Sequence, residues 1–179
     1  KTVVLASIEE QGKLTAELKK SIEEAATLVV VEDLYRPYRP KRRTRATIAK
    51  EKGLEPLADL ILLQQMKGSV LDAARDYISG EKGVATAEEA VEGAKDILAE
   101  RISDNAEYRT YIRNATMSQG SLQSVAKDEK AESVYEMYYQ YEETIKKTAG
   151  HRILALNRGE KEKFLTVKVL APVEQIIRF

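Results

Sequence analysis

Short helical segments, each opened by a residue that caps a helix, dominate the first two thirds of the chain. Thr15 precedes apolar residues at helical spacing and predicts one helix over residues 15–34. Thr86 with Glu89 forms a capping-box pattern ahead of a longer segment whose apolar spacing reaches Ile102. Because such segments bury their apolar faces against one another, we predict a mainly α, multi-helix bundle. Other helices are predicted to begin at Thr44 or Thr47, Pro56, Ser69 and Asp104, with Gly53 and Gly80 as stops.

The pattern changes in the last third of the chain. Leu122 and Val125 suit a short strand, and "FLTVKVL" (164–170) alternates in the manner of a strand. The tyrosine-rich "VYEMYYQYEETIKK" (134–147) is predicted to be a helix, whereas "HRILAL" (151–156) fits a short helix or a strand. We therefore expect a small β element near the C-terminal end.

The composition limits the kinds of site that the chain can build. The sequence contains no cysteine and a single histidine, His151, which argues against disulfides, thiolate catalysis, Cys-type zinc sites and a Ser-His triad. No P-loop or dinucleotide glycine pattern is present, and the acidic clusters fit solvated helix faces better than metal ligands or acid–base pairs. We expect a protein without enzymatic activity, cofactor or metal.

The chain is predicted to be soluble and cytoplasmic, because it has no apolar run of membrane-spanning length and no secretory leader. Its 179 residues, 43% of them hydrophobic, suffice for one core or two small ones. We expect a helical region over 1–120 and a helix with short strands over 121–179. The start on Lys1 and the apolar end at Phe179 suggest a piece of a longer protein.

One stretch carries a strong local charge in a chain whose net charge is zero. Residues 35–53, "YRPYRPKRRTRATIAKEKG", are termed the basic segment below; they hold eight Lys and Arg and one acid, Glu51, so they sum to +7 and the rest of the chain to −7. The repeated Tyr-Arg-Pro has the three-residue period of a polyproline II helix, which predicts an inward tyrosine edge and an outward arginine edge. The candidate nucleic-acid-binding residues are Arg36, Arg39, Lys41, Arg42, Arg43 and Arg45.

The basic segment allows two main interpretations, which the residues alone leave even. It could bind phosphates in a salt-sensitive, sequence-independent way, with Tyr35 or Tyr38 stacking on an unpaired base if exposed. Alternatively, its arginines pair internally with acids such as Glu32 and Asp33, or Glu23 and Glu24, and have a structural role. A PxxP ligand for SH3 domains and a nuclear-import tag also fit, but both require an exposed, flexible segment.

Two further groups of residues allow both a functional and a structural interpretation. Arg152 and Arg158 fit phosphate contacts, but we favour a structural joint in which His151 or Arg152 caps or pairs and Gly159 supplies a turn. The four tyrosines between residues 135 and 141 fit base stacking, although packing with partly exposed hydroxyls is the more usual role.

Several long stretches resemble one known family. "VEDLYRPYRPKRRTRATIAKEKGLEPLADLIL" (31–62) resembles the signature block of the bacterial Tex family of transcription accessory proteins, relatives of the eukaryotic Spt-type elongation factors. Three more stretches are similar to Tex proteins in the order of that family: "IEEQGKLTAELKKSIEEA" (8–25), "ATAEEAVEGAKDILAERISDNAEYR" (85–109) and "HRILALNRGEKE" (151–162). The resemblance covers nearly the whole chain.

The resemblance implies a fold and a function. Tex proteins are multi-domain and bind nucleic acid; a helical N-terminal region with helix-turn-helix character precedes a YqgF-type, RNase-H-like domain, helix-hairpin-helix domains and an S1 RNA-binding domain. The chain would then be an N-terminal and central piece, a scaffold that supports RNA or DNA backbone binding through the basic segment. Its implied partners are RNA or DNA, the transcription machinery and the remaining Tex domains. The alternative is an interdomain packing and protein-interaction module without nucleic-acid binding of its own.

Overall fold

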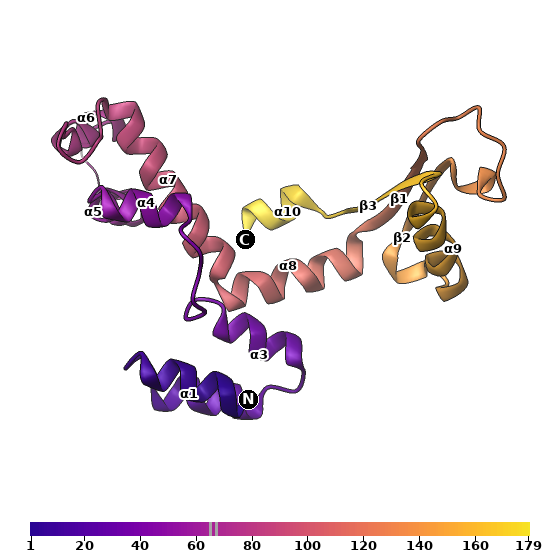
Figure 1. Ribbon diagram of the computed structural model, residues 1–179, viewed down its shortest axis with the longest axis horizontal. Coiled ribbons are helices and arrows are strands. Elements are labelled where there is room, and N and C mark those ends of the chain that lie inside the picture. The colour runs from indigo at the N-terminus through magenta and orange to yellow at the C-terminus, as the bar shows by residue number, and fades with distance from the viewer. Residues whose placement is uncertain (65, 67) are drawn as a thin grey trace. The chain divides into compact units, whose positions relative to one another are not determined.

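The computed structural model describes residues 1–64, 66 and 68–179, which form two compact units. The first unit, Lys1–Arg109, is helical, and the second, Thr110–Phe179, contains a small antiparallel sheet with helices (Figure 1). The predicted mainly α fold with a little β near the C-terminal end is therefore confirmed. None of the helices in the described residues is long and apolar enough to cross a membrane.

Three helices at the start of the chain share one small core. They are α1 (Thr2–Glu10), α2 (Ala16–Glu24) and α3 (Leu28–Tyr35). Ile8, Ile22 and Val31, one from each helix, are buried against one another. The prediction of one helix over residues 15–34 is wrong, because Ala25 leaves the helical conformation (φ −55°, ψ 121°) and Thr27 accepts a hydrogen bond from Val30 N–H to cap a new helix. This break lets α3 turn back onto the same core.

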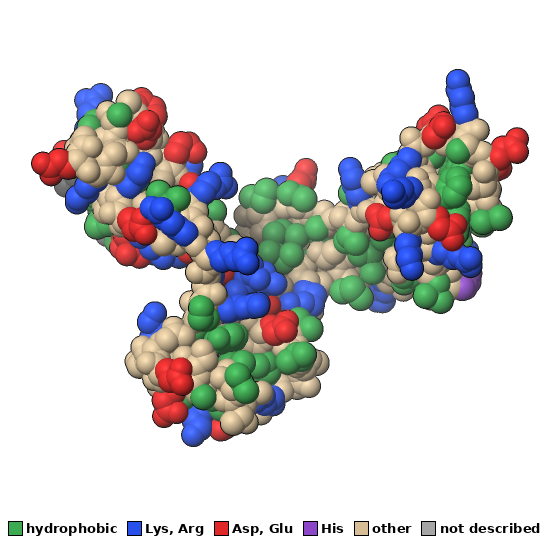
Figure 2. Space-filling view, viewed as in Figure 1, with side chains coloured by type: hydrophobic (Ala, Val, Ile, Leu, Met, Phe, Trp, Pro, Cys, Tyr) green, Lys and Arg blue, Asp and Glu red, His purple; other side chains and the backbone are tan. Residues whose placement is uncertain are grey.

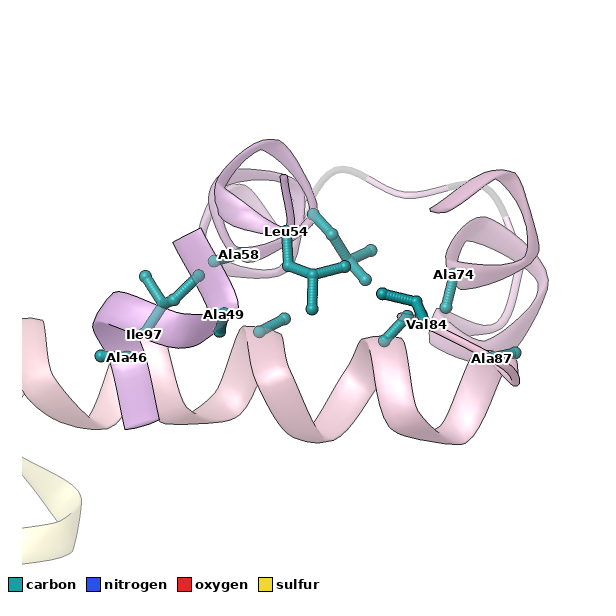
Figure 3. Packing of buried hydrophobic residues seen from close by; sticks show 11 residues of the cluster. Ala46, Ala49, Leu54, Ala58, Ala74, Val84, Ala87 and Ile97 are labelled. Atoms are coloured by element: carbon teal, nitrogen blue, oxygen red, sulfur yellow. The ribbon is translucent and has the colours of Figure 1, made fainter. Parts of the chain in front are cut away.

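The rest of the first unit packs along one long helix. The elements are α4 (Arg45–Glu51), α5 (Glu55–Leu63), α6 (Val70–Ala74), the 3₁₀ helix η1 (Arg75–Tyr77) and α7 (Ala87–Asp104). Small residues on α7 allow close approach of the shorter helices, whose side chains point toward it (Figure 3). Gly93 shows this most clearly, since a Cβ there would lie 2.4 Å from Cδ1 of the buried Leu54.

Most predicted helix starts of this unit are confirmed. Thr44, Ser69 and Thr86 each accept a hydrogen bond from the backbone N–H three residues later, and Gly53 follows α4 with a φ of +78°. The predicted cap at Asp104 is wrong. The next residue, Asn105, accepts from Tyr108 N–H at 3.0 Å and so starts α8 (Ala106–Gln119), which leaves the Asp104 carboxylate available for other partners.

The second unit is built on a three-stranded antiparallel sheet of order β2-β1-β3. The strands are β1 (Ser121–Ala126), β2 (Gln140–Thr144) and β3 (Leu165–Leu170), and the helical elements are η2 (Glu136–Tyr138), η3 (Ile145–Lys147), α9 (Gly150–Lys161) and α10 (Val173–Arg178). The strands predicted at Leu122 with Val125 and in "FLTVKVL" are confirmed. "HRILAL" lies in α9, whose Leu156 is fully buried with Leu165.

The predicted helix over residues 134–147 is wrong. Tyr135 and Tyr138 are buried in the core of the second unit, and residues 140–144 form β2, where exposed and half-buried residues alternate. Tyrosine and threonine favour strands once β1 offers a pairing edge, so tertiary context decides here. Gly159 also differs from its predicted turn role: it lies inside α9, where a Cβ would meet Leu165 Cδ1 at 2.7 Å.

Candidate nucleic-acid interface

The start of the basic segment forms a tight turn at the end of α3. Arg36 has helical dihedrals, and the carbonyl of Tyr35 accepts hydrogen bonds from the backbone N–H groups of Tyr38 at 2.9 Å and Arg39 at 3.0 Å. The predicted polyproline II conformation is therefore wrong. The preference of a residue before proline for an extended backbone is modest, and the two hydrogen bonds at the Tyr35 carbonyl together with tyrosine packing outweigh it here.

The tyrosines of the turn point inward, as predicted. Tyr35 and Tyr38 are half-buried against the core of α1, α2 and α3. The Tyr35 hydroxyl lies 3.0 Å from Ser7 Oγ, and the Gln11 side-chain amide donates to the Tyr38 carbonyl at 2.9 Å. Because their rings are engaged in packing, these tyrosines anchor the turn rather than offer a platform for a base.

Two of the six candidate cations bind one nearly buried carboxylate. Asp104, at the end of α7, is 8% exposed; it accepts a hydrogen bond from Arg36 Nε at 3.0 Å and another from Lys41 Nζ. Arg36 and Lys41 stand at the two ends of the loop 36–41, so Asp104 holds both ends. Their side chains remain 46% and 29% exposed. This part of the segment therefore forms ion pairs within the first unit.

The acids that pair with the basic segment form a stripe on α7. Asp96, Glu100 and Asp104 follow one another at four-residue spacing, which places them on one face of the helix. Asp96 lies 3.5 Å from Arg45 Nε, and Glu100 lies 3.4 Å from Lys41 Nζ and 3.9 Å from Lys50 Nζ. The internal pairing expected for the segment thus exists in part, but through distant acids.

Asp33, one of the acids expected to pair with the basic segment, forms an ion pair with Arg109. Asp33 is buried and accepts a hydrogen bond from Arg109 Nε at 2.6 Å, which ties α3 to the start of α8. The stripe on α7 was missed at the sequence level. The sequence does contain a signal for this stripe, because three carboxylates follow one another at four-residue spacing on a long predicted helix.

The other four candidate cations remain at the surface. Arg43 pairs with Glu51 at 2.7 Å but its side chain is 67% exposed, and Arg45 is 87% exposed beside Asp96. Within the described residues, neither Arg39 nor Arg42 has a carboxylate within 4.0 Å, and both are exposed. Lys and Arg side chains gather around the loop between α3 and α4 (Figure 2). The structure thus divides the six residues into two that bind the nearly buried Asp104 and four that do not.

A hollow of about 550 Å³, termed the α7 hollow below, lies beside this loop in the first unit. Its lining comprises Pro37, Arg39, Lys41, Thr47, Lys50, Glu100, Arg101, Asp104 and Asn105. Arg101 is held at 2.5 Å by Asp59 and at 2.9 Å by Glu55. The hydrogen bond to Asp59 raises the pKa of Arg101, with the bond to Glu55 contributing.

The remaining candidates have structural partners. Arg152 donates to Glu143 at 2.7 Å, which joins α9 to β2, and Arg158 pairs with Glu162 at 2.9 Å. The hydrogen bonds to these glutamates raise the pKa values of both arginines. His151 is exposed on α9. No group of three or more His, Cys, Asp or Glu side chains in residues 1–64, 66 and 68–179 has the geometry of a metal site.

Comparison with known proteins connects this architecture to one family. Residues 67–177 match the family model "Tex central region-like". The chain is 51% identical to the uncharacterized protein YdcI of Bacillus subtilis over 98% of its length, 44% identical to Protein tex of Bordetella pertussis over 93%, and 39% identical to the transcriptional accessory protein Tex of Neisseria gonorrhoeae over 93%.

The matched region is a part of each relative. The chain spans 25%, 21% and 22% of the lengths of the proteins from Bacillus, Bordetella and Neisseria, respectively. The similarity covers both units of the structure and includes the basic segment and the acidic stripe of α7, because it extends over nearly all of the chain. The chain therefore belongs to the Tex family of transcription accessory proteins, and most of it corresponds to the central region of that family.

Proposed function

We propose that this chain supports sequence-independent binding of RNA or DNA by a larger Tex protein, through contacts of the basic segment with the phosphate backbone. The role is non-catalytic: the segment supplies positive charge at a fixed place on a helical scaffold. We include in this proposal the helix-turn-helix character that the family resemblance implies for the region. The relatives named as transcription accessory proteins support a setting in which nucleic acid is the nearby polyanion.

The observation that carries this proposal is the accessibility of four arginines. Arg39 and Arg42 have no acidic partner in the described part of the chain, and Arg43 and Arg45 are paired only at the exposed surface. Exposed ion pairs contribute about 0–1 kcal/mol each, so a phosphate can replace Glu51 or Asp96 at little cost. Each phosphate that is neutralised releases counterions, which gives affinity without base readout.

The test is a fluorescence-anisotropy titration of the chain with labelled single- and double-stranded oligonucleotides at two salt concentrations. We expect binding at low salt that weakens steeply as salt rises. The variant in which Arg39, Arg42, Arg43 and Arg45 are all changed to Ala should reduce the slope of log K against log salt by up to about 3 to 4 units. A matched control changes Lys19, Lys20, Lys146 and Lys147 to Ala. These four lysines are also exposed, and their substitution removes the same amount of positive charge.

The comparison between the two variants decides the proposal. An equal loss in both variants would mean that net charge alone matters and that the basic segment is not the site. The absence of binding to the unchanged chain at low salt would refute the proposal and leave the second candidate, an interdomain packing module. The two cations bound to Asp104 are the observation that favours this second candidate.

A further inference from the structure

Some of the hydrogen-bond donors that line the α7 hollow are already bound to carboxylates of the protein. Lys41 binds Asp104 and Glu100, and Arg101 binds Asp59 and Glu55. These donors are occupied and form the walls of the hollow. Lys41 and Arg101 could bind a ligand only if one of these internal ion pairs were broken.

Thr47 is also committed. The hydroxyl of Thr44 donates to Glu100 Oε1 at 3.0 Å, so its oxygen can only accept from the Thr47 hydroxyl, which lies 3.0 Å away. The Thr47 backbone N–H donates to the same oxygen at 3.1 Å. The hydroxyl proton of Thr47 is therefore used inside the protein, and this lining side chain cannot donate it to a ligand as well.

Three side chains in the lining keep donor groups that make no hydrogen bond within the described residues. Arg39 has neither a side-chain hydrogen bond nor an ion pair there, and Lys50 has one long ion pair, with its Nζ 3.9 Å from Glu100 Oε2, but no side-chain hydrogen bond. Asn105 is fixed by its cap, because its Oδ1 accepts from Tyr108 N–H. The amide NH₂ of Asn105 consequently has no hydrogen-bond partner among the described residues. The three donors come from the loop, from α4 and from the α7–α8 junction.

The charge around the hollow selects the ligand class. The connected ion pairs and the lining together contain five cations (Arg36, Arg39, Lys41, Lys50 and Arg101) and four carboxylates (Glu55, Asp59, Glu100 and Asp104), a net charge of +1. One phosphodiester, with a single negative charge, balances this. Two of its oxygens accept hydrogen bonds and match a guanidinium fork with further N–H donors.

We propose that the α7 hollow is a subsite for one backbone phosphodiester of a nucleic acid, contacted by Arg39, Lys50 and the Asn105 amide. This subsite rests on the proposed function and gives it a fixed point: Arg42, Arg43 and Arg45 supply diffuse attraction, while the hollow holds one phosphate in place. Asp104 acts as a positioning residue, since it fixes both ends of the loop that carries Arg39.

The experiment compares pairs of variants with equal charge change in the anisotropy assay. Arg39→Gln is matched by Arg42→Gln, an exposed arginine of the same segment that does not line the hollow. Asn105→Asp keeps a side-chain oxygen for the cap but replaces the donor with a carboxylate oxygen. It is matched by Asn114→Asp, which is exposed on α8 and outside the lining. Circular dichroism of all four variants is the check that each one is folded.

We expect Arg39→Gln and Asn105→Asp each to weaken oligonucleotide binding about tenfold, and their matched variants at most about threefold. Equal effects within each pair would overturn the subsite while leaving the proposed function intact, because long-range attraction alone would explain them. If the unchanged chain does not bind at low salt, both proposals fail together.

Discussion

The hydrogen bonds to Asp104 predict a measurable contribution of this residue to stability. Asp104→Asn keeps the shape of the side chain and removes its charge, so the bonds from Arg36 and Lys41 lose their ionic character. A fully buried pair broken in this way costs about 3–5 kcal/mol, and an exposed one about 0–1 kcal/mol. Since both cations are partly exposed and can rehydrate, we assign about 1 kcal/mol to each bond.

One opposing term reduces this cost. Asp104 is the last residue of α7, where a negative charge is disfavoured by the helix dipole, so its removal returns roughly 0.5 kcal/mol. The expected destabilisation of the first unit is therefore about 1.5 kcal/mol. For a unit of this size, such a change lowers the melting temperature by about 6 to 12 °C.

The assay is urea denaturation followed by circular dichroism, together with a thermal melt. Asp96→Asn is the matched control, because it makes the same change on the same face of the same helix while its partner Arg45 is 87% exposed and 3.5 Å away. We expect a loss of less than about 0.5 kcal/mol for the control. Equal losses in the two variants would refute the assignment of a structural role to the Asp104 carboxylate.

Two more outcomes are expected from the packing and from the second unit. Gly93→Ala should destabilise the chain by about 1 kcal/mol in urea denaturation: the gain of Ala over Gly in a helix is smaller than the cost of displacing Leu54. Hydrogen bonds from Tyr141 and Arg152 lower the pKa of Glu143 below the 4.5 of a free glutamate. The contribution of ionised Glu143 to stability is therefore present above the pKa of a free glutamate and is lost as the pH falls through the lowered pKa of the folded state. Glu143→Gln should therefore show a smaller acid-induced drop in melting temperature than the unchanged chain.

Local signals in the sequence predicted much of the helical structure. The caps at Thr44 and Thr86 were correct because the capping oxygen and its N–H partner lie three residues apart, so no distant segment intervenes. Residues 134–147 were predicted incorrectly because their conformation depends on β1, which offers a pairing edge that no local pattern shows. The cap at Asp104 failed for a related reason: two neighbouring residues could both cap, and the ion pairs with the distant basic segment involve Asp104.

The charge pattern of the sequence indicated the candidate site but not which of its cations pair with carboxylates. The density of Lys and Arg marked the segment, whereas the division between anchored and accessible cations depends on which residues face α7. Arg36 and Arg39 are equivalent in the repeated Tyr-Arg-Pro sequence, yet the turn directs one to Asp104 and leaves the other without an acidic partner among the described residues. Lys50 and Asn105 could not have been assigned, because the hollow exists only in the folded chain.

The partial neutralisation of the basic segment is compatible with both a contribution to the fold and the proposed attraction for a polyanion. Eight cations at close range repel one another, and without acids nearby they would oppose the packing of α4 on α7. Asp96, Glu100, Asp104 and Glu51 offset half of that charge and leave the segment at +4. Complete pairing would remove the attraction for phosphate, and no pairing would leave the loop without a fixed position. The position of the α7 acids thus determines where the loop is held, and their number determines the charge that remains for the proposed contact with phosphate.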